Sequence, residues 1–491
     1  MPDNTPRQAS LLQAFIPVTV LVVMLGTNVY LFGSASLDGS NQIALLLSAS
    51  IAGIIAIRLG IDWQAVLKAM VKSISSAMSS ILILLLIGAL AGTWLISGII
   101  PVMIYYGLQI LNPTIFLVAA CVICAMVSLA TGSSWSTVAT VGIALLGIGQ
   151  TLGLQEGVIG GAIISGAYFG DKMSPLSDTT NLAPAMAGTD LFTHIRYMAI
   201  TTIPSILIAL FIYLLIGFYS DASGSVEDVK EVLAAIESKF YITPWVFLVP
   251  LTVIVMIIKR VPALPALLVG VLSGGLCALI LQPEIVNEVS GIPDHYLKSS
   301  YIGLMQAMYG NVEITSSHTM VNELLTSGGM SGMLNTVWLI LCAMTFGGAM
   351  EAGGLLKRIA FEVIKLARST GSLIASTVAT CLFFNVTASD QYMAIVVPGR
   401  MYADTYRARG LKPENLSRVL EDSGTVTSVL VPWNTCGATQ ASVLGVATMV
   451  YAPFSFFNII SPFMTMLVGF MGIKIRYYEP QEQTIEVEAK V

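Results

Sequence analysis

The chain has 491 residues, of which 55% are hydrophobic and 10% are charged, and its net charge at neutral pH is -5. The mean hydropathy is +0.82, and no soluble domain of this length needs so much apolar surface, so the composition excludes a soluble enzyme or nucleic-acid-binding protein. A hydrocarbon core requires about 20 predominantly apolar residues per spanning helix, and about a dozen stretches meet this requirement. The composition predicts an all-α polytopic membrane protein.

The N-terminal unit, residues 1–75, is expected to hold two spanning helices at about 11–33 and 41–58. The first apolar run lacks a clean small-residue cleavage site, so we interpret it as a retained helix rather than a signal peptide. Basic residues mark the cytoplasmic side of membrane proteins, and Arg58 ends the second run. This pattern indicates a cytoplasmic N-terminus.

The next unit, residues 76–219, contains the polar cluster ATGSSWST, residues 130–137, between two apolar runs. These runs form either two full spans or one re-entrant hairpin, and the hairpin is favoured because it brings Arg196 to the cytoplasm. The predicted elements are a spanning helix at about 76–98, an uncharged loop to Pro113, a hairpin at about 113–150, a broken helix at about 157–190 and a spanning helix at about 197–219.

A linker, residues 220–330, follows. It starts with a segment, residues 220–240, that has five acidic residues, Asp221 among them, against two basic ones, as an external loop should. Two spanning helices come next, the second at about 263–281, and then a polar external segment at about 283–330.

The last large unit, residues 331–476, repeats the earlier order. Its predicted elements are a spanning helix at about 333–351, an amphipathic surface helix at LLKRIAFEVIKLARS, a hairpin at about 371–400, a broken helix at about 417–450 and a final span at about 454–473. The tail, residues 477–491, is too polar to fold alone and is predicted to be disordered in the cytoplasm.

Matching residues support an internal repeat. The matched pairs, separated by 256 to 258 residues, are Thr131 with Thr387, Ser133 with Ser389, Ser165 with Ser423, Pro175 with Pro432 and Gly188 with Gly445. The first hairpin opens outward and the second inward, so the two halves have opposite topology. Such inverted repeats are typical of secondary transporters, whose broken helices bind substrate or ions near the midplane.

The stretch GDKMSPLSDTTNLAP, residues 170–184, is the strongest candidate for a cation site. Charges at membrane depth are costly, and proline frees a backbone carbonyl, so an oxygen-rich cluster there suits Na+ and lets H+ compete for a carboxylate. The predicted cation- or proton-binding residues are Asp171, Ser174, Ser177, Asp178, Thr179, Asn181 and Asp390, with Ser177, Asp178 and Asn181 as Na+ ligands. In an alternative interpretation, Asp171 and Lys172 only pair with each other or with a neighbouring helix end. Glu421 and Asp422 belong either to the site or to a cytoplasmic helix start.

The polar tips are the candidates for binding a substrate. The predicted residues are Thr131, Gly132, Ser133, Ser134, Trp135, Thr387, Ser389, Asn434, Thr435 and Cys436. Trp135 lines a pocket or serves in packing and gating. No P-loop glycine pattern is present in the sequence, which argues against transport driven by ATP.

The strings TGSSW, GDKMSPLSDTTNLAP, PGRMY, LEDSGTVTS and PWNTCGA resemble the NhaC family of sodium/proton antiporters within the ion transporter superfamily. The resemblance implies a scaffold domain and a transport domain, an elevator-like movement and a homodimer in the lipid of a bacterial inner membrane. It also implies Na+ and H+ as coupling ions, with no other cofactor. We expect Na+/H+ antiport; the alternatives are coupled transport or exchange of a small carboxylate or amino acid, and, less favoured, a channel.

Overall fold

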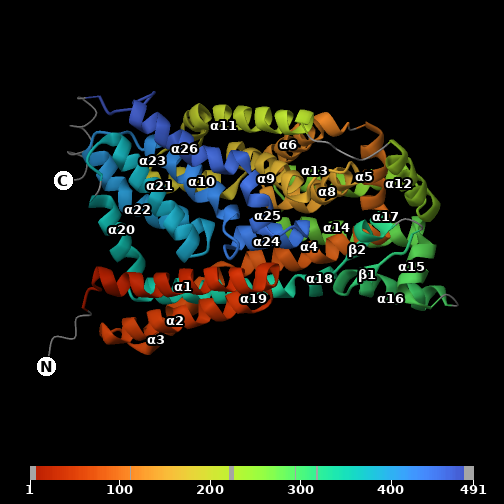
Figure 1. The fold of residues 1–491 in the computed structure, drawn as a ribbon, viewed down its shortest axis with the longest axis horizontal. Helices are drawn as coiled ribbons and strands as arrows, with labels where there is room; N and C mark the ends of the chain where they lie inside the picture. The colour runs from red at the N-terminus through yellow and green to blue at the C-terminus, as the bar shows by residue number, and fades with distance from the viewer. Residues whose placement is uncertain are drawn as a thin grey trace.

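The computed structural model describes residues 7–110, 112–219, 226–292, 295–316, 319–365 and 367–479. Asp221 and the tail from residue 480 onward, both part of the predictions above, lie outside these ranges. Helices make up almost all of the described chain (Figure 1), and its one small sheet pairs β1 (Val312–Glu313) with β2 (Thr326–Ser327) in antiparallel register. The prediction of an all-α protein is confirmed.

Eight helices in the described ranges are long and apolar enough to cross a membrane, or ten if two bent pairs each count as a span. The eight are α1 (Leu11–Phe32), α2 (Ser40–Arg58), α4 (Met78–Ile96), α6 (Pro113–Thr131), α11 (Leu191–Tyr219), α14 (Ala263–Leu281), α18 with α19 (Gly329–Ala352) and α21 (Thr370–Thr387). The bent pairs are Val229–Lys239 with Pro244–Ile258, at 88°, and Thr448–Phe454 with Phe456–Met471, at 55°.

Apart from the helices around the first polar tip, the other helices of the first two thirds of the chain are shorter. They are α3 (Trp63–Ser76), α5 (Ile99–Ile110), α12 (Val226–Lys239), α13 (Leu248–Ile258), α15 (Pro283–Ser290), α16 (Tyr296–Tyr309) and α17 (Thr319–Leu324). The expected loop before Pro113 is wrong, because α5 occupies it: Gly98, at φ 78°, turns the chain after α4, and the uncharged residues beyond it form a largely buried helix.

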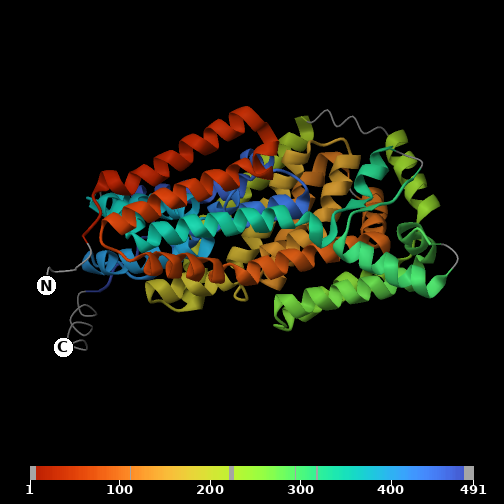
Figure 2. The ribbon, with the colours of Figure 1, turned by 90° about the horizontal axis from the view of Figure 1, so that it is seen from below.

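The first described residues, before α1, and the last ones, after α26 (Phe456–Met471), lie at the same end of the molecule (Figures 1 and 2). This end also carries α20 (Leu355–Lys365), whereas α12, α15 and α16 lie at the opposite end. The basic residues of α20 and the acidic residues of α12 are therefore separated along the long axis of the protein.

The first polar tip is a sharp turn. Gly132 has φ 71°, and a Cβ atom there would come within 2.6 Å of the Leu176 side chain, so only glycine fits. Ser133 then caps α7 (Ser134–Thr137), which continues through a π-helical turn, Val138–Gly142, into α8 (Ile143–Thr151). The tip thus reverses the chain against the segment that contains Leu176.

The segment opposite this tip is a helix that breaks and restarts. α9 (Glu156–Met173) stops at Ser174, and α10 (Asp178–Ala187) begins at the cap Ser177. α9 lies very close to α6, since a Cβ atom at Gly166 would lie 2.0 Å from the carbonyl oxygen of Cys121. Close packing therefore fixes the break beside the tip.

The second region has the same order of features. α21 ends at Thr387, Ser389 has φ 59°, and Asp390 caps α22 (Gln391–Ala408). The broken helix consists of α23 (Glu414–Leu420), a π-helical turn Glu421–Thr425, a 3-10 turn Ser428–Leu430 and α24 (Thr435–Leu444), followed by α25 (Thr448–Tyr451).

Backbone features of the two regions recur 257 residues apart. The pairs are Gly132 with Ser389 at positive φ, Ser133 with Asp390 and Ser177 with Asn434 as helix caps, and Gly188 with Gly445 as left-handed helix ends. The expected match of Ser133 with Ser389 is therefore shifted by one residue. α10 packs on α22 and α23, while α24 packs on α8 and the first π-helical turn, so the two regions interlock.

Candidate functional site

A cavity of about 830 Å³ lies where the first tip meets the break between α9 and α10. Nine of the predicted site residues line it, namely Thr131, Gly132, Ser133, Trp135, Asp171, Ser177, Asp178, Thr179 and Asn181. The rest of the wall includes Ser79 and Ser80 of α4, Arg260 in the turn between α13 and α14, Gln391 and Tyr392 of α22, and several apolar residues. The cavity therefore combines carboxylates, hydroxyls and aromatic rings with one guanidinium group.

Asp171 joins the break to the first tip. Its Oδ2 atom accepts hydrogen bonds from the backbone nitrogen of Ser134, at 3.1 Å, and from the Ser134 hydroxyl, at 2.7 Å. Ser134 is at the start of α7, where a negative charge is favourable. The Ser133 hydroxyl accepts from the Ser136 backbone nitrogen, at 3.2 Å. Both tip serines thus hold the turn in shape, and the Asp171 carboxyl group lies beside them.

Most polar side chains in the break hold backbone atoms. Ser174 Oγ accepts from the Leu176 nitrogen at 3.2 Å, and Ser177 Oγ accepts from the Thr180 nitrogen at 3.4 Å. The Asn181 amide donates to the carbonyl oxygens of Pro175, at 3.0 Å, and Ser177, at 2.6 Å. These bonds replace the helical hydrogen bonds that are lost at the break.

Asp178 is different from its neighbours. It is the first residue of α10, its side chain is exposed to the cavity, and no hydrogen bond or ion pair to it is found among the described residues. Its charge also lies at a helix N-terminus, which suits an anionic group. Asp178 is therefore a carboxylate of the cavity wall that no described protein group neutralises.

Lys172 does not pair with Asp171, so that part of the alternative interpretation is wrong, whereas Asp171 is bonded to the start of α7, a neighbouring helix end. The Lys172 side chain is fully buried and forms an ion pair with Asp422; its ammonium also donates to Ser461 Oγ at 3.0 Å and lies 5.5 Å from the centre of the Phe457 ring. Neighbouring residues of a helix point in directions about 100° apart. Lys172 therefore faces away from the cavity that Asp171 lines.

Glu421 and Asp422 lie inside the protein rather than at an exposed helix start. Both side chains are fully buried in the π-helical turn. Asp422 Oδ2 accepts from the Thr201 hydroxyl at 2.8 Å, and Glu421 Oε1 accepts from the Thr179 hydroxyl at 3.0 Å. Thr179, a predicted cation ligand, thus connects the cavity to Glu421 of the second region.

The second tip and the second break bind each other. Asp390 Oδ1 accepts from the Met393 nitrogen at 3.0 Å, and its Oδ2 is 3.5 Å from the Thr435 hydroxyl. The Thr435 nitrogen donates to the Ser389 carbonyl at 2.9 Å, and the Trp433 indole donates to the Val386 carbonyl at 2.8 Å. These contacts close the second tip over its break.

Other predicted residues of the second region are also buried in local contacts. Asn434 caps α24 through the Cys436 nitrogen, at 3.0 Å, and its amide donates to the Asn385 carbonyl at 3.0 Å. The Thr387 hydroxyl donates to the Phe383 carbonyl at 2.7 Å. Of the second region, only Gln391 and Tyr392 reach the cavity wall. The structure thus brings the first set of predicted residues together and keeps the second set apart from it.

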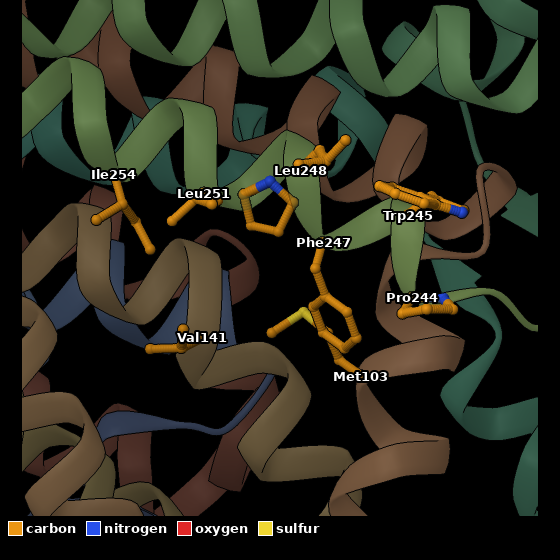
Figure 3. Close-up of a pocket in the computed structure, with 9 residues that line it drawn as sticks. Met103, Val141, Pro244, Trp245, Phe247, Leu248, Leu251 and Ile254 are labelled. Carbon is orange, nitrogen blue, oxygen red and sulfur yellow. The ribbon is translucent and has the colours of Figure 1, made fainter.

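A second cavity, of about 440 Å³, lies between α5, the first π-helical turn and α13 (Figure 3). Its wall includes Met103, Val141, Phe247 and Leu251, and no charged side chain lines it. An ion would lose its hydration there without compensation. This cavity is therefore no candidate for the ion site.

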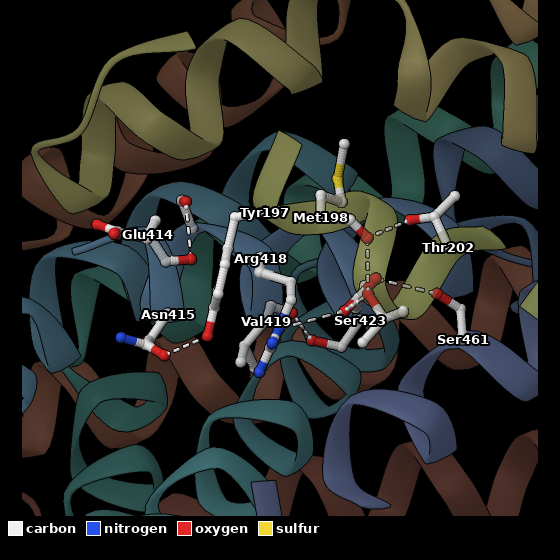
Figure 4. A network of polar contacts seen from close by, with 12 residues as sticks. Tyr197, Met198, Thr202, Glu414, Asn415, Arg418, Val419, Ser423 and Ser461 are labelled. Atoms are coloured by element: carbon white, nitrogen blue, oxygen red, sulfur yellow. Dashed lines mark hydrogen bonds and ion pairs between the residues drawn. The ribbon is translucent and has the colours of Figure 1, made fainter. Parts of the chain in front are cut away.

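Sequence reasoning missed two basic residues. Arg260 lines the large cavity, and Arg418 is fully buried in α23 beside the ring of Tyr197 (Figure 4). Arg418 stands at the start of a run that was predicted to be a membrane helix, and an intramembrane charge is itself a signal of function. That signal could have found it.

A broken helix that meets a polar helix tip at a carboxylate-lined cavity, within a bundle of apolar helices, is characteristic of an ion-coupled secondary transporter. A family model described as the Na+/H+ antiporter family matches residues 166–473. The chain belongs to this family, and the resemblance to NhaC proteins is confirmed by its relatives.

Two of these relatives are Na(+)/H(+) antiporters named NhaC. The protein from Alkalihalophilus pseudofirmus is 36% identical over 88% of this chain and 91% of its own length. The protein from Bacillus subtilis is 36% identical over 88% of this chain and 92% of its own length. A third relative, the malate-2H(+)/Na(+)-lactate antiporter of Bacillus subtilis, is 34% identical over 95% of this chain and 97% of its length.

Proposed function

We propose that the protein is a secondary active antiporter that exchanges Na+ for H+, and that Asp178 in the large cavity is its principal cation ligand. The observation that carries this proposal is the exposure of an unpaired carboxylate at a broken membrane helix, in a member of the Na+/H+ antiporter family. Na+ and H+ are the coupling ions, and both bind carboxylate oxygen.

The cation site is built from the break. Asp178 supplies the charge, and the oxygen atoms of Ser177 and Asn181, one on each side of it in the first turn of α10, supply neutral ligands. Hard cations prefer such oxygen ligands. Asp171 adds a second carboxylate, and a proton and a Na+ ion compete for the pair. Asp390, a helix cap outside the cavity wall, stabilises the second tip.

Transport requires the site to face the two sides of the membrane in turn. We assign the end with α20 and both chain ends to the cytoplasm, because basic residues favour that side. Arg260 lies beside Lys259 in the turn between α13 and α14, and this basic pair favours the cytoplasmic side. Because Arg260 lines the cavity, we propose that the cavity faces inward. The recurrence at 257 residues supports two inverted repeats in a transport domain that moves like an elevator against a scaffold, within a homodimer in the bacterial inner membrane.

The size of the cavity favours a second candidate function. A volume of about 830 Å³ falls within the range of small-molecule sites, roughly 300–1,000 Å³, and far exceeds what a Na+ ion needs. Arg260 can bind a carboxylate, and one relative is named as a malate and lactate antiporter. In this candidate the cation site drives transport of a small organic carboxylate or amino acid, with Thr131, Ser133 and Trp135 beside the solute.

Proton flux in proteoliposomes tests the proposal. An internal pH dye would follow wild type, Asp178→Asn and, as a matched control, Asp404→Asn, which changes an exposed carboxylate on α22. We expect a Na+ gradient to drive proton movement in wild type and in the control but not in Asp178→Asn. If wild type shows no Na+-coupled proton movement, Na+/H+ exchange is rejected, and carboxylates and amino acids are added to the same vesicles to test the second candidate.

A further inference from the structure

Asp422 lies between two buried cations. The side chains of Asp422, Lys172 and Arg418 are all fully buried. The Lys172 ammonium contacts Oδ1, whereas the nearest atom of Arg418, Nε, is 4.0 Å from Oδ2, which is too long for a hydrogen bond. One carboxylate thus faces two positive charges and is bonded to one of them.

Arg418 lacks acceptors in this arrangement. None of its three guanidinium nitrogens has a hydrogen-bond partner within the described part of the chain. Besides the Asp422 carboxylate at 4.0 Å, it contacts the Tyr197 ring, whose centre is 4.7 Å from the guanidinium carbon. A buried charge without hydrogen bonds is strongly unfavourable, and a cation–π contact offsets only part of that penalty. Within the described ranges, the Arg418 guanidinium therefore has free hydrogen-bond donors and would be stabilised by any acceptor that moved within reach of them.

The other carboxylates near Arg418 are bonded to other groups through one oxygen each. Glu414 pairs with Arg476 at 3.1 Å, and Glu421 Oε1 accepts from Thr179, whereas Glu421 Oε2 has no hydrogen-bond partner among the described residues. Oδ2 of Asp422 accepts from the Thr201 hydroxyl at 2.8 Å, and it needs to move only about 1 Å to come within the distance of a charge-assisted hydrogen bond to Arg418. Figure 4 shows Arg418 beside Tyr197, with Ser423 and Ser461 of the same network close by.

Lys172 is connected to the cation site through the backbone. It belongs to the last turn of α9, directly after Asp171, and the Thr180 hydroxyl donates to the carbonyl oxygens of Asp171, at 3.2 Å, and Lys172, at 3.0 Å. A change in the break that accompanies cation binding therefore moves Lys172 as well. Asp171 and Glu421 are the other charged groups near this lysine.

We infer that Asp422 changes partner during the transport cycle, leaving Lys172 and binding Arg418, and that Arg418 is a positioning residue for exchange. The inference rests on the proposed Na+/H+ exchange for its purpose but not for its geometry. In the structure Asp422 holds Lys172 and so fastens the first break to the second region. When Arg418 takes the carboxylate, that fastening is released and the break can rearrange.

Thermal unfolding of the purified full-length protein tests whether the two cations are alternative partners. We expect Arg418→Gln to leave the unfolding midpoint at or above that of wild type, because it removes an unpaired charge. Lys172→Gln lowers the midpoint by about 3 °C, since Arg418 replaces the lost partner, but the double variant lowers it by about 8 °C, because Asp422 then has no cation. If the midpoint shift of the double variant equals the sum of the two single-variant shifts, within error, the inference is overturned.

Exchange in proteoliposomes tests whether the change of partner serves transport. We expect Arg418→Gln to slow Na+-driven proton flux about tenfold while the half-saturating Na+ concentration stays within about twofold. Arg418→Lys, which retains a cation, restores most of the rate. A purely structural arginine predicts a wild-type rate in Arg418→Gln, and that result overturns the inference. If wild type itself exchanges no protons for Na+, the proposed function fails, while the unfolding midpoints still decide the change of partner.

Discussion

The two helix breaks have the same backbone construction, but the first borders an open cavity and the second is closed by hydrogen bonds to its tip. Around residues 174–177, polar groups border a cavity, and Asp178 points into it without a partner among the described residues. Around residues 431–434, the equivalent groups are bonded to the second tip, and none of them lines the cavity. A repeated backbone design therefore does not give two equal sites: the first break leaves the Asp178 carboxylate unpaired beside a cavity, whereas the polar atoms of the second break bind the second tip.

The largest expected effect separates the two breaks at one equivalent position. Asp178 and Thr435, both the first residue of a restarted helix, lie 257 residues apart. We expect Asp178→Asn to reduce Na+-driven proton flux at least about 100-fold and Thr435→Val to change it by less than about threefold. Comparable losses in both variants would show that the second break also contributes ligands in the transport cycle.

The next effect concerns the first tip. Gly132→Ala places a Cβ atom within 2.6 Å of Leu176 at a residue with φ 71°, so we expect it to lower the free energy of unfolding by about 2–4 kcal/mol. Gly445→Ala is the matched control, because its φ is 70° and its Cβ would meet nothing within 4 Å. The control should lose only the backbone preference, about 1–2 kcal/mol. Equal shifts in the unfolding midpoint would mean that the contact with Leu176 is unimportant.

A smaller difference is expected between the carboxylates at the two tips. Asp171→Asn removes a charge from the start of α7 and from the cavity, so we expect a loss of about 0.5–1 kcal/mol in stability and a proton flux about tenfold lower. Asp390→Asn keeps a good helix cap and should leave flux within about twofold. Thermal unfolding and the vesicle assay on both variants check this. A loss of exchange in Asp390→Asn would show that Asp390 binds the cation or the proton, as the sequence predicted.

The smallest effect is a gain. Ser389 has φ 59° where the first tip has Gly132, so Ser389→Gly removes a backbone strain of about 1–2 kcal/mol, offset in part by the greater entropy of an unfolded glycine. We expect the unfolding midpoint to rise by about 1 °C with exchange unchanged. A lower midpoint would show that the buried Ser389 hydroxyl has a stabilising partner.

The sequence predicted the membrane class, the family and the place of the breaks, because runs of apolar residues and the charges that interrupt them follow directly from bilayer physics. It also predicted nine residues of the cavity wall, since they share two short stretches that the tip and the break bring together. The sequence did not predict that only the first of the two breaks borders the cavity. The stretches PLSDTTNL and PWNTCGA look equally polar, and which one borders open space is decided by distant elements such as the turn that carries Arg260.

The sequence also could not predict which carboxylate pairs with Lys172. Lys172 lies 250 positions from Asp422, and nothing local favours that carboxylate over the adjacent Asp171. α5 was missed for another reason: without charges, a short apolar run was interpreted as a loop although it is buried as a helix.

Each region also contains a π-helical turn, Val138–Gly142 in the first and Glu421–Thr425 in the second. Such a turn holds one residue more than the α-helical turn in its place. Deleting a residue there would restore a regular helix and rotate every later side chain by about 100°. Glu421 and the cap Asn434 would then no longer face their partners together. Natural variation in this protein should therefore change the side chains of these two turns far more readily than their length.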